Sequence, residues 1–225
     1  MTLEESAHHR FPTARIVVFA REPVLGQVKT RLEPVLGEAA CLALYRSMLG
    51  RILTTVRQAS LAPLALWVSS NVSHEFFLSY CNKTDIHLQK GQDLGQRMAR
   101  AARECLAVEG VDSLLIIGSD CPAMDAKYLA AAFEALQAGN EIVIGPARDG
   151  GYVLIGLKSL HEQVFMDIDW GTERVLEQTL ARVNAAKLPC HLLESLWDVD
   201  TPEDLKNLEK LDPPLPVKVV LAVER

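Results

Sequence analysis

The chain has 225 residues, of which 49% are hydrophobic and 23% are charged, and its formal net charge is −6 at pH 7. These totals are typical of one α/β domain, or of a domain with a small appendage. The acidic balance argues against a protein that binds a nucleic acid polymer without sequence preference, because such proteins need basic surface to displace counterions. It does not exclude a nucleotide ligand that a few local cations bind.

Apolar and polar patterns alternate between strand and helix along the chain. Strands are expected over 16–20, 64–68, 86–88, 114–117, 141–145, 152–155 and 191–193. Apolar residues at helical spacing predict helices from about residue 37 to 56, from 91–94 to about 108, over 129–136 and over 175–183, and a last helix begins after Thr201. Strands that alternate with helices indicate an α/β fold with a mostly parallel central sheet flanked by helices.

The polar residues 1–13 carry no apolar signal core, and no apolar run is long enough to span a bilayer. We therefore expect a flexible N-terminal segment over 1–13, a single domain over 14–211 and a cytoplasmic protein without a membrane span. The tail, 212–225, could add an edge strand to its own sheet, the favoured interpretation, or to that of a second copy in a homodimer. Five scattered cysteines without a Cys-x-x-Cys pair argue against a disulfide framework or a zinc site.

The expected strand over 114–117 is a continuous apolar run that enters Gly118-Ser119-Asp120-Cys121-Pro122. Such a run is typical of a strand buried on both faces, as in a parallel sheet. In open α/β sheets, ligands bind beyond the carboxyl ends of the strands. Asp120 could therefore hold a divalent cation on a phosphate ligand. The alternative is that Asp120 only caps the turn.

Cations follow the first expected strand. Arg21, Lys29 and Arg31 surround Gly26 in a loop and could neutralise a di- or triphosphate, although a solvated loop is the simpler interpretation for any one of them. The loop lacks both glycines of a P-loop. No Gly-x-Gly-x-x-Gly follows any strand, and no Gly-x-Ser-x-Gly elbow is present, so a dinucleotide cofactor and acyl transfer lack support.

Further aspartates follow the later strands. Asp149 precedes Gly150-Gly151, where backbone can come close to a sugar or a base. Asp198 and Asp200 lie two positions apart, so in an extended segment they project to the same side. A cation between Asp120 and one of this pair would bridge phosphate oxygens, as in phosphoryl-type transfer.

Five ordered motifs carry a resemblance to a known family. They are Lys-Thr-Arg-Leu at 29–32, Gly-Gln-Asp-Leu-Gly-Gln-Arg-Met at 91–98, Gly-Ser-Asp-Cys-Pro at 118–122, Gly-Pro-Ala-Arg-Asp-Gly-Gly-Tyr at 145–152 and Trp-Gly-Thr-Glu at 170–173. Over roughly 14–211 the chain resembles the bacterial GT-A-like nucleotide-diphospho-sugar transferases, some of which are labelled arsenosugar-biosynthesis glycosyltransferases. It is more distantly similar to the 2-phospholactate and molybdenum-cofactor guanylyltransferases.

The resemblance implies a nucleotide-binding α/β sandwich with Mg²⁺ or Mn²⁺ as its cofactor. It implies that Asp120 and Asp200 bind the metal, and that Lys29 and Arg31 lie near the phosphates as catalytic cations. The implied nucleotide-binding set is Arg21, Gly26, Lys29, Asp93, Leu94, Gly95 and Ser119. The implied substrate-binding set is Asp149, Gly150, Gly151, Trp170 and Thr172, with Asp149 also catalytic.

The expected partners are thus a nucleoside triphosphate or a nucleotide sugar and a small-molecule acceptor. We expect transfer of a nucleotidyl group to a small phosphorylated acceptor. Two alternatives are open: a glycosyltransferase in which Asp149 orients or deprotonates the acceptor hydroxyl, and a non-catalytic nucleotide-binding module. The turn at Asp120 is Asp-x-Pro and not the Asp-x-Asp of many glycosyltransferases, and the first loop is not the glycine-rich loop of sugar nucleotidyltransferases.

Overall fold

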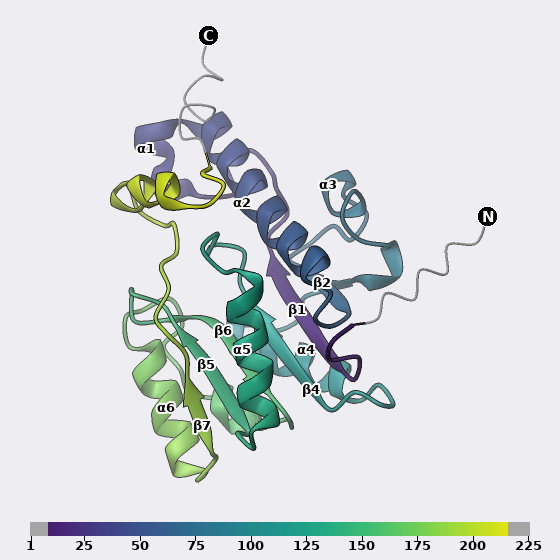
Figure 1. The fold of residues 1–225 in the computed structure, drawn as a ribbon. Helices are drawn as coiled ribbons and strands as arrows, with labels where there is room; N and C mark the ends of the chain where they lie inside the picture. Colours follow the sequence, from purple (N-terminus) through teal and green to yellow (C-terminus); the bar gives the residue numbers. More distant parts are fainter. Residues whose placement is uncertain (1–8, 216–225) are drawn as a thin grey trace, which may run out of the picture.

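The computed structural model describes residues 9–215, so the expectations for residues 1–8 and for an edge strand after residue 215 lie outside it. The seven strands form one sheet with the order β3-β2-β1-β4-β6-β5-β7 (Figure 1). They are β1 (Ala14–Ala20), β2 (Leu64–Val68), β3 (Ile86–Leu88), β4 (Ser113–Ile117), β5 (Ile142–Pro146), β6 (Tyr152–Leu157) and β7 (Cys190–Leu192). Only β6 runs antiparallel to its neighbours, β4 and β5, so the expected mostly parallel sheet is confirmed.

The four longer helices expected from apolar spacing are present. The α-helices are α1 (Glu33–Leu36), α2 (Glu38–Ala59), α3 (Glu75–Leu78), α4 (Leu94–Leu106), α5 (Ala126–Gln137) and α6 (Val175–Ala185). The 3-10 helices are η1 (Thr30–Leu32), η2 (Lys83–Asp85), η3 (Glu162–Phe165) and η4 (Pro202–Lys210). The single-turn elements were not predicted, because three or four residues are too few to display a 3.6-residue period.

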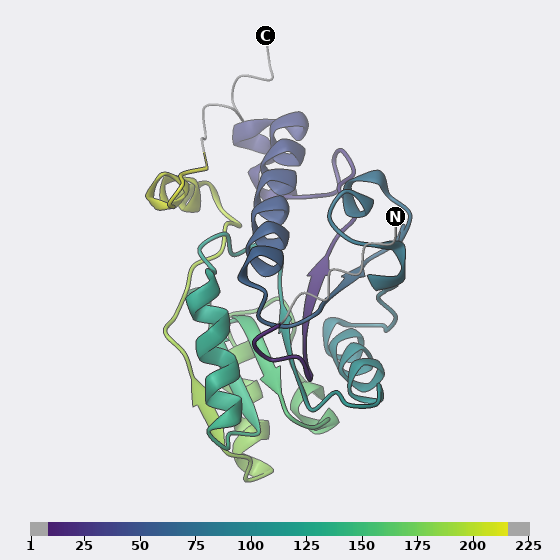
Figure 2. The same ribbon diagram turned by 45° about the vertical axis from the view of Figure 1, so that its right-hand side comes forward.

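Helices cover both faces of the sheet, with α2 and α5 on one face and α4 on the other (Figures 1 and 2). Alternate residues of β1 supply the two cores. Ile16 and Val18 belong to the cluster that contains residues of α2 and α5. Val17 and Phe19 belong to the cluster that contains residues of α4 and α6. Apolar burial on both faces explains why the central strands read as continuous hydrophobic runs.

A third cluster packs the start of α2 against η4 and the segment before it. Leu44 of α2 and Leu205 and Leu208 of η4 are buried together with Val199, and η4 lies beside α1 and the start of α2 in Figure 1. Near the other terminus, Phe11 is buried with its ring 4.8 Å from that of Phe133. No helix of the described residues is both long and apolar enough to cross a membrane.

The sheet places several loops at one edge. The carboxyl ends of β1, β4 and β5 lie at this edge, and β6 begins there because it is antiparallel to β4 and β5. The segment after β7 crosses the same edge. Its backbone amides donate from Leu196 to the carbonyl of Pro146 at 2.9 Å and from Val199 to the carbonyl of Asp120 at 3.0 Å. The fold therefore brings the Asp198–Asp200 segment to the turn that holds Asp120.

Candidate functional site

A buried lysine joins two distant aspartates at this edge. The ammonium of Lys29 contacts the carboxylate of Asp120, lies 3.0 Å from that of Asp200 and donates to the carbonyl of Val199 at 2.7 Å. The side chain of Lys29 is 5% exposed, whereas those of Asp120 and Asp200 are 45% and 39% exposed. The two aspartates expected to meet around one cation thus meet around the ammonium of Lys29.

Lys29 is held in position by its backbone as well as by its ion pairs. It adopts a left-handed conformation with φ 53° immediately before η1, and its carbonyl accepts from the amide of Leu32 at 2.8 Å. Burial alone would lower the pKa of Lys29, but attraction to Asp120 and Asp200 outweighs burial and raises it. The side chain is therefore an ammonium ion at neutral pH.

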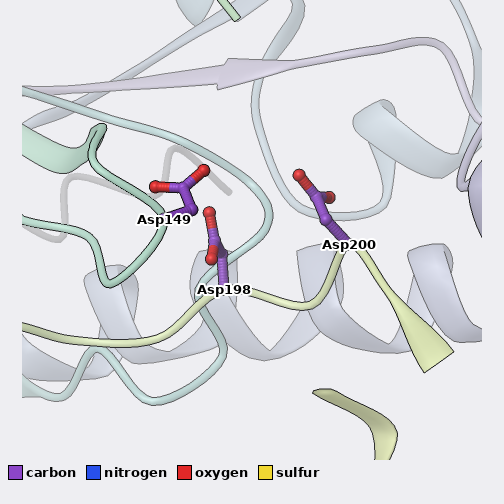
Figure 3. A group of neighbouring side chains, drawn as sticks. All are labelled: Asp149, Asp198 and Asp200. Atoms are coloured by element: carbon purple, nitrogen blue, oxygen red, sulfur yellow. The ribbon is translucent and has the colours of Figure 1, made fainter. Parts of the chain in front are cut away.

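Three aspartates form a cluster beside this ion pair. Asp149, Asp198 and Asp200 each present a carboxylate oxygen, and these oxygens lie within 4.8 Å of one another (Figure 3). Burial, followed by repulsion from Asp149 and Asp200, raises the pKa of Asp198 to about 6. Asp200 belongs both to this cluster and to the ion pair with Lys29, so it links the ammonium, which contacts Asp120 and Asp200, to the two further carboxylates of Asp149 and Asp198.

Short loops hold the cluster in place. Asp149 lies in the turn between β5 and β6, where its carboxylate accepts from the amide of Gly151 at 2.9 Å. Gly150 has φ +90°, and a Cβ there would lie 2.1 Å from the carbonyl oxygen of Glu173. Only glycine fits this position, because it allows both the left-handed backbone and the close approach to the segment that leads into α6.

A capping box fixes the backbone of Asp200. The carboxylate of Asp204 accepts from the amides of Asp200 at 3.0 Å and Thr201 at 2.8 Å, and from the Thr201 hydroxyl at 2.8 Å. Burial would raise the pKa of Asp204, but these hydrogen bonds lower it. The helix expected after Thr201 is therefore η4, and Asp204, at its third position, caps its start and holds the backbone of Asp200.

A buried tyrosine supports the first loop. The hydroxyl of Tyr45, on α2, accepts from the amide of Arg21 at 2.7 Å and donates to its carbonyl at 2.9 Å. It also lies 3.5 Å from the hydroxyl of Ser119. This role was not predictable from the sequence, because Tyr45 falls on the apolar stripe of α2 among core residues.

A cavity of about 330 Å³ gathers most of the predicted site. Its predicted lining residues are Arg21, Lys29, Arg31, Leu94, Ser119, Asp120, Asp149, Gly151, Trp170, Thr172 and Asp200. Asp198, weighed as one of two alternatives, lines it too, and Tyr45 and Tyr152 are lining residues that sequence reasoning missed. Gly26, Asp93, Gly95 and Gly150 do not line it.

Asp93 and Gly95 have local structural roles. Asp93 is the N-cap of α4, and its carboxylate accepts from the amide of Gln96 at 2.7 Å. Gly95 is packed so closely that a Cβ would lie 2.5 Å from the carbonyl oxygen of Phe165 and 2.8 Å from the indole of Trp170. The 91–98 motif therefore positions Trp170, whose ring meets that of Tyr152 edge to face at 6.2 Å between centroids.

A second cavity of about 530 Å³ shares Arg21, Leu94 and Asp120 with the first. It extends over the carboxyl ends of β1, β2 and β3, where Glu22 and Gln89 line it. The side-chain amide of Gln89 donates to the carbonyls of Ala20 at 3.2 Å and Trp67 at 2.8 Å. The two cavities together form an elongated space with carboxylates at the junction.

Cys121, beside Asp120, is a packing residue. Its side chain is 1% exposed, and burial raises the pKa of its thiol to about 12. A thiol is a nucleophile only as the thiolate. The cysteine is therefore protonated at neutral pH and carries no nucleophilic chemistry.

The carboxylates of the cavity supply the oxygen ligands that a hard divalent cation prefers, and its arginines suit an anionic ligand. Arg21 and Arg31 line the cavity from the loop after β1, and the four carboxylates line it from the turns after β4 and β5 and from the segment after β7. Among the described residues, Asp120 and Asp200 form ion pairs with Lys29 alone, and Asp149 and Asp198 form none. Their uncompensated charge favours binding of a further cation.

The chain matches the family described as "Uncharacterized protein conserved in bacteria (DUF2064)" over residues 52–172. A solved structure from Desulfovibrio desulfuricans G20, assigned to the nucleotide-diphospho-sugar transferases, is 30% identical. The match covers 93% of this chain and 94% of that one, with a TM-score of 0.82. The structure of a CMP:2-keto-3-deoxy-manno-octonic acid synthetase complexed with CTP shares the fold at 12% identity and a TM-score of 0.59, covering 89% of this chain and 98% of that one.

Among curated proteins, the bifunctional protein GlmU of Sinorhizobium medicae (strain WSM419) is 29% identical over 119 residues. This match covers 51% of the chain and 25% of GlmU, so the chain spans about a quarter of the length of that relative. The resemblance predicted from the five motifs is confirmed by the family match and by the D. desulfuricans structure. The chain therefore belongs to the DUF2064 family of bacterial proteins and has the fold of the nucleotide-diphospho-sugar transferases.

Proposed function

We propose that this protein is a divalent-metal-dependent transferase that binds a nucleoside triphosphate and transfers its nucleotidyl group to a small phosphorylated acceptor. The observation that carries the proposal is the meeting of four carboxylates, the ammonium of Lys29 and the side chains of Arg21 and Arg31 around one cavity. Transfer without a covalent intermediate needs positioning and electrostatic stabilisation, and this arrangement provides groups for both.

The donor set fits the metal that the fold family implies. Asp200 would hold Mg²⁺ or Mn²⁺ together with Asp120, the ligand pair expected from the sequence, and Asp149 and Asp198 lie close enough to Asp200 to complete the ligand shell. The raised pKa of Asp198, about 6, marks a place where negative charge is in excess. When bound, the metal would neutralise phosphate charge and orient the oxygens.

The protein's own side chains would do the rest. Arg21 and Arg31 would bind phosphate oxygens at the cavity rim, and Arg31, with Lys29, would stabilise the charge of the leaving group. The second cavity, over the ends of β1 and β2, would take the nucleoside. Asp149, Gly151, Trp170 and Thr172 line the side of the first cavity that is built from the β5–β6 turn and the approach to α6, and they would contact the acceptor.

Glycosyl transfer from a nucleotide sugar is the second candidate. The observation that favours it is the exposed carboxylate of Asp149, which lies within the acidic cluster and lines the same cavity. Such a group could orient or deprotonate an acceptor hydroxyl. The assignment of the D. desulfuricans relative to the nucleotide-diphospho-sugar transferases also supports a nucleotide sugar as donor.

The reaction products separate these candidates. The protein is titrated by calorimetry with nucleoside triphosphates and with nucleotide sugars, with and without Mg²⁺, and is then incubated with a set of small phosphorylated and hydroxylated acceptors. Release of pyrophosphate supports nucleotidyl transfer, whereas release of a nucleoside diphosphate supports glycosyl transfer. Binding without either product would indicate a non-catalytic nucleotide-binding module.

Matched variants tie the result to the site. Asp200→Asn should abolish the metal dependence of nucleotide binding, whereas Asp112→Asn, whose carboxylate contacts Thr13 far from the cavity, should leave it unchanged. If neither class of nucleotide binds in the presence or absence of Mg²⁺ or Mn²⁺, the proposed function is wrong.

A further inference from the structure

The ammonium of Lys29 lies where the sequence places a metal. Asp120 and Asp200 were expected to meet around a divalent ion, and the group that joins them in the structure is Lys29, which makes three contacts with oxygen acceptors. An ammonium has three donors, so the side chain is fully satisfied in this position. A divalent ion that used both carboxylates would have to take the acceptors that Lys29 now holds.

We propose that Lys29 is a built-in competitor of the divalent ion: its ammonium closes the gap between Asp120 and Asp200, and metal binding across this pair requires its displacement. The inference rests on the proposed function, since it concerns the metal of that site. The displaced ammonium would remain in the cavity lined by Arg21 and Arg31. Its new partner there would be an anion, namely the phosphate groups of the nucleotide.

Two features of Lys29 determine what displacement of its ammonium requires. Lys29 is almost fully buried, so an ammonium that leaves both carboxylates without a new partner would be left desolvated and unpaired. Its backbone is fixed at φ 53° before η1, so the change has to occur in the side chain. Metal and nucleotide should therefore bind cooperatively, because the metal displaces the ammonium from the carboxylates and the phosphates of the nucleotide give the ammonium a new partner.

The first test is Mn²⁺ binding without nucleotide, measured by electron paramagnetic resonance on the full chain. Lys29→Met should bind Mn²⁺ roughly tenfold more tightly than the wild type or better, and Lys29→Met/Asp120→Asn should lose this gain. Arg31→Gln is the matched control, since it removes one positive charge from the same cavity without a contact to Asp120. Equal gains in Lys29→Met and Arg31→Gln, or no gain in Lys29→Met, would overturn the proposal.

A second test uses the wild type and does not depend on the folding of a variant. Lysine acetylation by acetic anhydride is followed by mass spectrometry as Mn²⁺ is added. Lys29 should be protected in the metal-free protein and become several-fold more reactive as the metal displaces it, whereas exposed Lys206 should not change. Unchanged protection of Lys29 at Mn²⁺ saturation would contradict the proposal.

A third test separates this inference from the proposed function. Lys29→Met should weaken binding of a nucleoside triphosphate several-fold in the presence of Mn²⁺ and leave it unchanged in metal-free buffer, where Lys29 stays paired with the aspartates. Equal weakening in both conditions would show that Lys29 is free to bind phosphate at all times and would overturn the competition. Failure of the wild type to bind any nucleotide would refute the proposed function, while the Mn²⁺ results would still decide the competition.

Discussion

The ammonium of Lys29 lies 3.0 Å from the carboxylate of Asp200, although 171 positions separate the two residues in the chain. The contact joins the loop after β1 to the segment that precedes η4, and the same ammonium also contacts Asp120 after β4. One buried charge therefore connects three loops that the sheet brings to a single edge. The stability of the protein should depend on this connection.

We first predict that Asp120→Asn and Asp200→Asn are strongly non-additive. Each single change leaves Lys29 with one carboxylate, which still compensates its charge, so it should cost about 1 kcal/mol of unfolding free energy, the usual net contribution of one hydrogen bond. The double change leaves a buried ammonium without a counter-ion and should cost roughly 4 kcal/mol. Urea unfolding at pH 7 in EDTA measures the three values.

Glu209→Gln, an exposed change on η4, serves as the control and should change stability by less than about 0.5 kcal/mol. Additive costs in the double variant would mean that solvent and other groups already compensate Lys29. The ion pairs of Lys29 would then contribute no more to the free energy of unfolding than an exposed salt bridge does.

The second prediction concerns the turn that carries Asp149. Gly150→Ala should lower stability by about 3 kcal/mol or more, because its Cβ would overlap the backbone of Glu173 and the residue would also be strained at φ +90°. Gly139→Ala is the matched control: it has φ +104° and no atom within 4 Å of a Cβ, so only backbone strain of about 1 kcal/mol applies.

Thermal unfolding of the two alanine variants gives the comparison. The difference between them isolates the steric contact with Glu173. If Gly150→Ala and Gly139→Ala cost the same, the approach of this turn to α6 is looser than the structure indicates, and Asp149 is correspondingly less well positioned.

The third prediction tests the support of Asp200. Asp204→Ala removes the carboxylate that accepts from Asp200 and Thr201, and should cost about 1 to 2 kcal/mol, the usual range for loss of an N-terminal cap. Because the backbone of Asp200 loses its anchor, Mn²⁺ affinity should also fall. Glu203→Ala changes the neighbouring acidic residue of the same first turn, which has no such contact among the described residues, and should leave Mn²⁺ affinity within about twofold of the wild type.

These cases indicate how far sequence reasoning reaches. The buried parallel strands and amphipathic helices were predictable, since continuous apolar runs and helical spacing follow directly from burial on both faces of a sheet. The position of Asp120 beyond β4 followed from the same rule. The one-turn helices and the antiparallel direction of β6 were not predictable, because neither leaves a periodic pattern.

Sequence reasoning was weaker on the chemistry of individual side chains. Lys29 was expected to face phosphates, and nothing in its neighbours signals that its backbone is left-handed and its ammonium points to Asp120 and Asp200. In the sequence, Tyr45 could not be distinguished from the core residues of α2, because its apolar ring is buried and only its hydroxyl reaches Arg21. Long-range polar contacts depend on packing, and a single sequence does not encode them in a local pattern.

The last prediction is a pH dependence that arises from Asp198. The pKa of this carboxyl is raised from 3.8 to about 6 by burial first and then by the negative charges of Asp149 and Asp200. Well below pH 3.8 the group is protonated in both the folded and the unfolded chain and contributes nothing. Between pH 4 and 6 the unfolded chain releases the proton more readily, so the folded state loses stability as the pH rises, and the full penalty applies above pH 6.

Asp198→Asn removes this penalty because the side chain cannot ionise. In metal-free buffer the variant should be more stable than the wild type at pH 7.5 by on the order of 1 to 2 kcal/mol, and the gain should vanish towards pH 4. Urea unfolding of both proteins across this pH range measures the difference between their unfolding free energies. Groups that titrate alike in the two proteins cancel in this difference. Mn²⁺ should reduce or reverse the gain at pH 7.5, since a bound cation stabilises the ionised carboxylate that only the wild type has. A variant that is destabilised equally at every pH would mean that Asp198 contributes through packing and hydrogen bonds, not through the repulsion among the clustered aspartates.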